Sequence, residues 1–274
     1  MSFRINTNTA ANFANVYGQM NQAKIDSSME KLSTGLRINR AADDSAGMAI
    51  ANQLRSQSQG LLQANRNIND AVGLVQIADG AMDEYQKILV TARDKAIQAT
   101  SDTNSQEARD ALEEDVKQLL EQADQIAKTT QFNGINLLDG TFTSKKFQVG
   151  SESGQTITMS IANADIAAQG IDDASVDLTT QVGAEAAIVL LDDAIKGIDG
   201  IRSGIGSTQS ALESRLRVNS QTQVNVKAAE SQIRDVDYAE ESTNFDRLSI
   251  ISQAGNFALA QANAMQQNVL RLLQ

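Results

Sequence analysis

Apolar residues recur at alternating intervals of three and four throughout residues 45–99. Only Gln57 in this series is polar. Because the alternation keeps one stripe facing a partner helix, it predicts coiled-coil packing. At a rise of about 1.5 Å per residue, the helix would be a rod roughly 80 Å long. The positions are Ile50, Leu54, Gln57, Leu61, Ala64, Ile68, Ala71, Val75, Ala78, Met82, Tyr85, Leu89, Ala92, Ala96 and Ala99.

The rest of the middle region predicts three further elements. A polar break at residues 100–105 ends the first helix, and a helical pattern at 112–126 predicts the returning arm of a helical hairpin. Apolar residues then alternate with polar ones around a glycine-containing turn, which predicts one β-hairpin near 141–162. Residues 163–183 are polar, and we expect an irregular, exposed segment. A third long helix is expected from about Ala184, despite internal glycines that weaken an isolated helix.

Both ends of the chain carry narrow, alanine-rich apolar stripes. The N-terminal stripe slips in phase between Met20 and Ile25, and such a slip turns the apolar face toward different partners. One pair of such helices would be marginal alone, so we expect both ends to fold together on association with other copies. The expected inter-subunit packing residues are Phe13, Tyr17, Met20, Ile25, Met29, Leu32, Leu36, Leu248, Ile251, Gly255, Ala258, Ala262, Met265, Val269 and Leu272.

These patterns predict a mostly α fold, namely an elongated antiparallel helical bundle or coiled coil with one small β-hairpin region. The two terminal segments, 1–44 and 236–274, are expected to form a terminal coiled coil. Residues 45–235 are expected to form a helical rod domain with the hairpin near 141–162. The complete absence of proline agrees with long uninterrupted helices, because proline breaks the hydrogen-bond ladder of a helix.

Composition then narrows the functional classes. The chain has no His and no Cys, which removes the usual zinc ligands, Cys nucleophiles, disulfides and His-based triads. Adjacent acidic pairs such as Glu113 and Glu114 diverge on a helix, which favours solvated faces over paired catalytic carboxylates. We therefore expect no enzymatic activity, no cofactor and no metal. The formal net charge of −11, without a basic stripe, argues against nucleic-acid binding.

No stretch of the sequence reaches transmembrane length, and the first ten residues lack the apolar core of a signal peptide. The protein is therefore expected either to be cytoplasmic or to leave the cell by a route that reads an uncleaved N-terminus. The charged residues Arg37, Arg40, Asp43 and Asp44 have two interpretations, as inter-subunit salt bridges or as ordinary turn and capping residues.

Four segments together resemble the bacterial flagellins. The first, KLSTGLRINRAADDSAGMAI at 31–50, is similar to the N-terminal signature of that family. The others are TQFNGINLLDG at 130–140, AESQIRDVD at 229–237 and QANAMQQNVLRLL at 261–273. The resemblance covers most of the chain and is weakest in the expected β-hairpin region.

This resemblance implies a structural subunit that self-assembles into the extracellular flagellar filament for motility. The terminal segments would form the filament core, and the variable outer domains of longer flagellins would be missing. Export would use the flagellar type III channel, and the implied partners are sister copies, an export chaperone, the filament cap and hook-junction proteins. The alternative is a hook-filament junction protein, which shares the terminal helical pattern.

The resemblance also implies a candidate immune-receptor segment, because a vertebrate Toll-like receptor recognises many flagellins at the end of the first long helix. This chain departs from the stimulatory pattern, with Thr91 where Arg is typical and Lys95 where Leu is typical. Losing an interfacial Arg and an apolar contact weakens binding. We therefore expect weak receptor activation. The candidate residues are Val90, Thr91, Arg93, Asp94, Lys95 and Ile97.

Overall fold

The computed structural model describes residues 7–171 and 176–272, and these residues are mostly helical. The predicted fold class is confirmed. The elements in chain order are α1 (Thr9–Thr34), α2 (Ser45–Ala99), α3 (Gln106–Thr129), β1 (Gln131–Phe132), β2 (Ile135–Asn136), β3 (Lys145–Gln148), β4 (Thr156–Met159), the short 3-10 helix η1 (Ala167–Gln169), α4 (Gln181–Arg234) and α5 (Tyr238–Leu272). The chain divides into two compact units, one of residues 57–224 and one formed by the two ends of the chain up to 56 and from 225.

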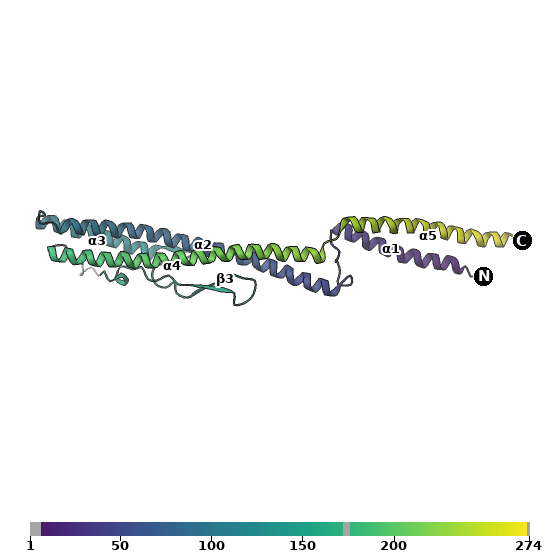
Figure 1. Cartoon of the computed structure of the whole chain (residues 1–274), viewed down its shortest axis with the longest axis horizontal. Coiled ribbons are helices and arrows are strands. Elements are labelled where there is room, and N and C mark those ends of the chain that lie inside the picture. The colour runs from purple at the N-terminus through teal and green to yellow at the C-terminus, as the bar shows by residue number, and fades with distance from the viewer. Residues whose placement is uncertain (1–6, 172–175, 273–274) are drawn as a thin grey trace. The chain divides into compact units, whose positions relative to one another are not determined.

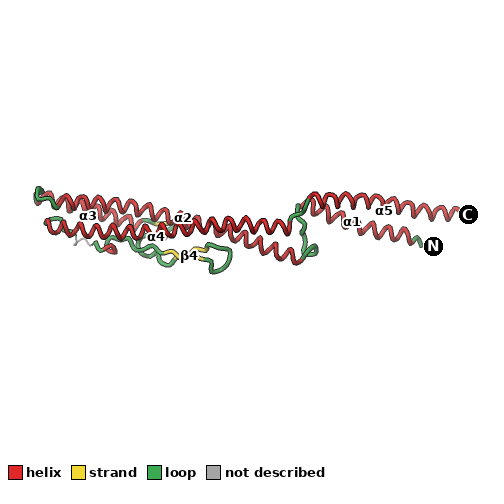
Figure 2. The backbone as a smooth tube through the Cα atoms, viewed as in Figure 1, coloured by secondary structure: helices red, strands yellow, loops and turns green. Residues whose placement is uncertain are grey.

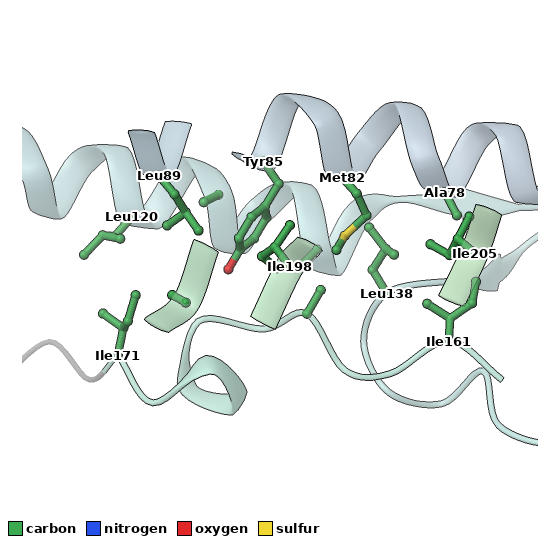
Figure 3. Packing of buried hydrophobic residues seen from close by; sticks show 14 of the residues in the cluster. Ala78, Met82, Tyr85, Leu89, Leu120, Leu138, Ile161, Ile171, Ile198 and Ile205 are labelled. Carbon is green, nitrogen blue, oxygen red and sulfur yellow. The ribbon is translucent and has the colours of Figure 1, made fainter. Parts of the chain in front are cut away.

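In the unit of residues 57–224, α2, α3 and α4 run side by side (Figure 1). Every member of the predicted α2 stripe from Leu61 to Ala99 is buried there. Figure 3 shows Met82, Tyr85 and Leu89 pointing into the apolar cluster that α3 and α4 complete. The stripe does not extend to the start of α2, because Ile50 is exposed and its neighbour Ala51 is fully buried instead.

The connection between α3 and α4 forms two small antiparallel hairpins (Figure 2). The predicted hairpin is β3 with β4, paired from Lys145 opposite Met159. The second, β1 with β2, was not predicted. Its turn is Asn133-Gly134, and both residues have positive φ, at 50° and 77°. That combination is typical of a two-residue hairpin turn, so the Asn-Gly pair was the available signal.

The expectation that residues 163–183 are exposed holds for Val182, which is 77% exposed, but it is wrong for three other apolar residues. Ile171, Val176 and Leu178 are each at most 1% exposed and belong to the main core cluster. Isolated apolar residues in an irregular segment have no periodicity that could reveal their burial. The Gln169 side chain lies against Gly197 of α4, where a Cβ would be 2.2 Å from the Gln169 Oε1. Because this oxygen ends a flexible side chain, it could shift to make room for a larger residue.

The Tyr85 hydroxyl is buried and has no hydrogen-bond partner within the described residues. Burial raises the pKa of Tyr85 above its ordinary value, and Asp124 and Asp165 add to this effect. The pKa of Tyr85 is higher in the folded state than in the unfolded state. The contribution of Tyr85 to the free energy of unfolding is therefore fully present below the unfolded pKa of about 10, and it falls as the pH rises above that value.

We expect Tyr85→Phe to be at least as stable as the parent at pH 8, since no hydrogen bond is lost. We also expect it to lose less stability than the parent between about pH 8 and pH 11. Urea denaturation at the two pH values measures both effects, with the exposed Tyr17→Phe as the matched control. An equal alkaline loss in parent and Tyr85→Phe would contradict the assignment.

Candidate assembly surface

The terminal helices α1 and α5 lie side by side in the second unit (Figure 1). They are antiparallel, since Asn8 near the start of α1 donates to the Ala262 carbonyl while Asn21 donates to the Leu248 carbonyl. The residues at their contact are mainly small or polar. The buried residues of α1 are Asn21 and Ser28, which are both polar, and Leu248 is the buried apolar residue among the α5 side chains that the structure describes.

Most of the large apolar side chains of both helices face outward instead. Phe257 is 81% exposed and Tyr17 is 66% exposed. Clustered exposed apolar residues of this size mark an interaction surface in a water-soluble protein. We call this set the outer apolar surface, and its members are Phe13, Val16, Tyr17, Met20, Met29, Tyr238, Ile250, Ile251, Phe257 and Met265.

The predicted packing residues separate into two groups. One group faces the partner helix or the adjoining turn and is buried or half-buried: Ile25, Leu32, Leu36, Leu248, Gly255 and Ala262. The other is exposed: Phe13, Tyr17, Met20, Met29, Ile251, Ala258 and Met265. The remaining two, Val269 and Leu272, lie outside the residues whose side chains the structure describes.

The apparent phase slip after Met20 has a simple structural origin. The positions of α1 that pack against α5 keep a regular helical spacing, and they are Ala14, Asn21, Ile25, Ser28 and Leu32. Two of these positions are polar, so a search for apolar residues misses them. The predicted stripe therefore begins with Phe13, Tyr17 and Met20, which are exposed, and continues with Ile25 and Leu32, which face α5.

Sequence reasoning missed several members of the outer apolar surface. Val16 stands three residues after Phe13 and four before Met20, so it fits a second helical series beside the one chosen. Ile250 and Phe257 are one heptad apart, in a series that runs parallel to Ile251 and Ala258. In each helix the exposed apolar face is therefore wider than a single stripe.

A groove of about 360 Å³ runs between α1 and α5. Four of the predicted packing residues line it, namely Tyr17, Ile251, Gly255 and Ala258. Gly255 has no heavy atom within 4 Å of the position a Cβ would occupy, so the groove has room there for another side chain. The surface thus combines projecting large apolar side chains with a shallow hollow lined by small ones.

The two aspartates between α1 and α2, Asp43 and Asp44, accept hydrogen bonds from nearby backbone N–H groups. The Asp43 carboxylate accepts from the backbone N–H groups of Arg40 and Asn39, and these bonds lower the pKa of Asp43. Asp44 accepts from the backbone N–H of Gly47 in the first turn of α2, as a helix-capping residue does. Both observations favour the turn and capping interpretation of these two aspartates.

Arg37 and Arg40 also have partners within the chain. The Arg37 guanidinium donates to the Ile233 carbonyl near the end of α4, at 2.7 Å. Arg40 forms an ion pair with Glu30 at 2.9 Å. Such exposed contacts contribute little to stability individually, so they leave both interpretations of these arginines open.

The candidate receptor segment lies on α2 in the unit of residues 57–224. Both of its basic side chains form ion pairs with other helices of the same chain. Arg93 pairs with Asp192 of α4, and Lys95 pairs with Asp115 of α3 at 2.6 Å. The bond from Arg93 lowers the pKa of Asp192. Val90 and Ile97 remain 43% and 42% exposed.

Among the described residues, no group of three or more acidic side chains is placed to hold a metal ion. In the same part of the chain, no helix has the length and apolarity needed to cross a bilayer. The fold and the outer apolar surface define a helical structural subunit.

Comparison with known proteins supplies the family. Residues 5–143 match the model of the bacterial flagellin N-terminal helical region, and residues 188–273 match that of the bacterial flagellin C-terminal helical region. The chain is 43% identical to a flagellin of Halalkalibacterium halodurans, covering 89% of this chain and 90% of that protein. It is 37% identical to a flagellin of Bacillus subtilis, covering 98% and 99%.

A crystal structure of Bacillus cereus flagellin is also similar, with 31% identity and a TM-score of 0.50 over 56% of this chain and 88% of that chain. The chain belongs to the bacterial flagellin family. It is a short flagellin, a structural subunit of the extracellular flagellar filament that polymerises with copies of itself. Relatives that align along nearly their whole length are flagellins, so the hook-junction alternative is not favoured.

Proposed function

We propose that α1 and α5 form the core of the filament and that the outer apolar surface packs against the same helices of neighbouring copies. The supporting observation is the outward direction of the largest apolar side chains, Tyr17 and Phe257 among them. Their removal from water would provide the driving force for polymerisation. In the same proposal, residues 1–44 and 236–274 make up the filament core and residues 45–235 form the rod domain.

We expect Tyr17→Ser to raise the critical concentration for polymerisation by about tenfold or more, since a buried aromatic side chain is worth over 1.4 kcal/mol at an interface. Sedimentation of purified protein over a concentration series measures this. The matched control is Val182→Ser, which removes an exposed apolar residue from the unit of residues 57–224. An unchanged critical concentration in Tyr17→Ser would contradict the proposal.

Assembly is the whole mechanism in this proposal, with no catalytic residue and no cofactor. The proposal includes three further partners. An export chaperone would cover the exposed apolar residues of α5, such as Ile250 and Phe257, before secretion. The filament cap and the hook-junction proteins would contact the terminal helices at the two ends of the filament.

The receptor segment carries a separate proposal, that this flagellin activates the vertebrate receptor weakly. The support is that both cations of the segment, Arg93 and Lys95, already form ion pairs with acidic residues of the same chain. We expect purified monomer to signal poorly at nanomolar dose. The double substitution Thr91→Arg and Lys95→Leu, which restores the typical residues, should increase potency by about tenfold or more.

A reporter-cell dose series measures that change, and Thr103→Arg on the loop after α2 controls for the added charge. Strong signalling by the parent monomer would overturn the proposal, as would a double variant no more potent than the parent.

A further inference from the structure

The unit of residues 57–224 carries opposite charge at its two ends. Figure 1 shows the α2–α3 connection and the start of α4 at one end of this unit, with β3 nearer the other end. We call residues 93–117 and 181–196, at the end with the α2–α3 connection, the acidic end. These residues contain ten carboxylates and five cations, which leaves a formal charge of −5.

Every cation of the acidic end already has an ion-pair partner within that end. Arg93 pairs with Asp192, Lys95 pairs with Asp115, and the other three cations pair in the same way. Five carboxylates have no ion pair among the described residues, and all five are exposed. They are Asp94, Glu107, Asp110, Glu114 and Glu185. This end therefore presents uncompensated negative charge from α2, α3 and α4.

Away from the acidic end, the β3–β4 hairpin packs on α2 and α4. Asn67 of α2 donates to the Gln148 carbonyl at 3.4 Å, and Asn219 of α4 donates to the Val149 carbonyl at 2.7 Å. These hydrogen bonds bring three segments of the chain together. We call the three segments the cationic end, and they are residues 57–72, 145–159 and 213–224.

The charge balance of the cationic end is the reverse of that of the acidic end. Its five cations form no ion pair with any residue that the structure describes, and all five are exposed. They are Arg66, Lys145, Lys146, Arg215 and Arg217. Three carboxylates in the same segments, Asp70, Glu152 and Glu213, reduce the formal charge to +2. This end therefore presents uncompensated positive charge.

The two ends are too far apart to neutralise each other within one chain. About 33 residues of α2 separate Arg66 from Ala99, which corresponds to about 50 Å at 1.5 Å per residue. The Debye length at physiological ionic strength is only about 8 Å. The remaining cations of the unit, Lys87, Lys128 and Arg202, all form ion pairs with nearby carboxylates. The cations that remain without an ion pair are thus concentrated at one end.

A second copy of the chain is the partner that this charge pattern fits. The chain polymerises with copies of itself, so other copies surround it in every filament. A contact between two different patches of the same chain can repeat without closing, as an open filament requires. Ends of opposite charge attract when copies meet head to tail, whereas two like ends repel each other.

We propose that the cationic end of one copy lies against the acidic end of the next copy, and that this contact orients each subunit as it joins the filament. Exposed ion pairs are individually weak, so the contact changes the rate of addition more than the stability of the finished polymer. The inference does not depend on α1 and α5 forming the filament core, because all of these charges lie within residues 57–224.

Charge reversal at each end, and at both ends together, tests the contact. The acidic-end variant is Asp94→Lys with Glu114→Lys, and the cationic-end variant is Arg66→Glu with Arg217→Glu. The exchange variant combines all four substitutions. The control, Ser203→Lys with Ser207→Lys, adds positive charge at exposed positions of α4 between the two ends.

Circular dichroism first establishes that each variant is folded. Fragments of parent filaments then serve as seeds for every variant, so that growth beyond the first added subunits joins variant to variant. Light scattering follows elongation at about 0.01 M and about 0.15 M salt, between which the Debye length falls from about 30 Å to about 8 Å.

At the lower salt concentration, we expect the acidic-end and cationic-end variants to elongate about tenfold more slowly than the parent, as loss of charge steering predicts. The acidic-end variant is decisive, because its four added charges change the net charge from −11 to −7. General repulsion between acidic subunits would make it elongate faster. The control should elongate at least as fast as the parent. The exchange variant should recover to within about twofold of the parent, and all differences should shrink at the higher salt concentration.

Two results would overturn the inference. One is an acidic-end variant that elongates at low salt as fast as the parent or faster, even if the cationic-end variant is slow, since the cations would then contact some other partner. The other is an exchange variant that elongates no faster than the cationic-end variant, which would mean that the two ends do not meet.

Discussion

Ala258→Glu is expected to abolish polymerisation while leaving the unit of residues 57–224 folded. Ala258 is an exposed residue that lines the groove between α1 and α5, so in the proposed filament it is covered by a neighbouring copy. Burying an unpaired carboxylate costs several kcal/mol, so the critical concentration should rise by at least about a hundredfold. Ala262→Glu should have the same outcome by a different route, because Ala262 is half-buried beside α1.

Sedimentation and circular dichroism measure the two parts of this prediction. The matched control is Ala186→Glu, an exposed alanine of α4 within residues 57–224, and it should polymerise like the parent. Polymer at the parent level in Ala258→Glu would refute the proposed buried position of this residue.

Leu191→Ala is expected to destabilise the unit of residues 57–224 by about 2–5 kcal/mol. Leu191 is fully buried in α4 and belongs to the main core cluster, so its truncation leaves a cavity. The control is Val189→Ala on the same helix, where the side chain is 60% exposed and the cost should stay within about 0.5 kcal/mol. Denaturation followed by circular dichroism gives both values, and equal losses would contradict the observed packing of α4.

Long regular patterns were predicted well, because burial in a helical bundle repeats at the period of the helix. The α2 stripe from Leu61 to Ala99 is the clearest case. The hairpin β3–β4 followed from simple alternation. Ile171 and Leu178 were missed because an irregular segment buries single residues, at positions that depend on the helices it crosses and not on any local period.

The candidate surface was predicted in part. Apolar spacing identified Tyr17, Ile251 and Ala258, which the structure brings to one groove. It could not identify Asn21 and Ser28, because a buried polar residue resembles a solvent-exposed one until its partner on another helix is known. That partner lies more than two hundred residues away in the sequence, and no local pattern encodes such a contact.

The contact between α1 and α5 bears on how easily the two helices separate. Separating the two helices exposes only part of their apolar surface, because the members of the outer apolar surface are already exposed in the pair. The hydrogen bonds between the two helices can be exchanged for bonds to water at a small net cost. The two terminal helices should therefore separate and pair again at a low cost in free energy.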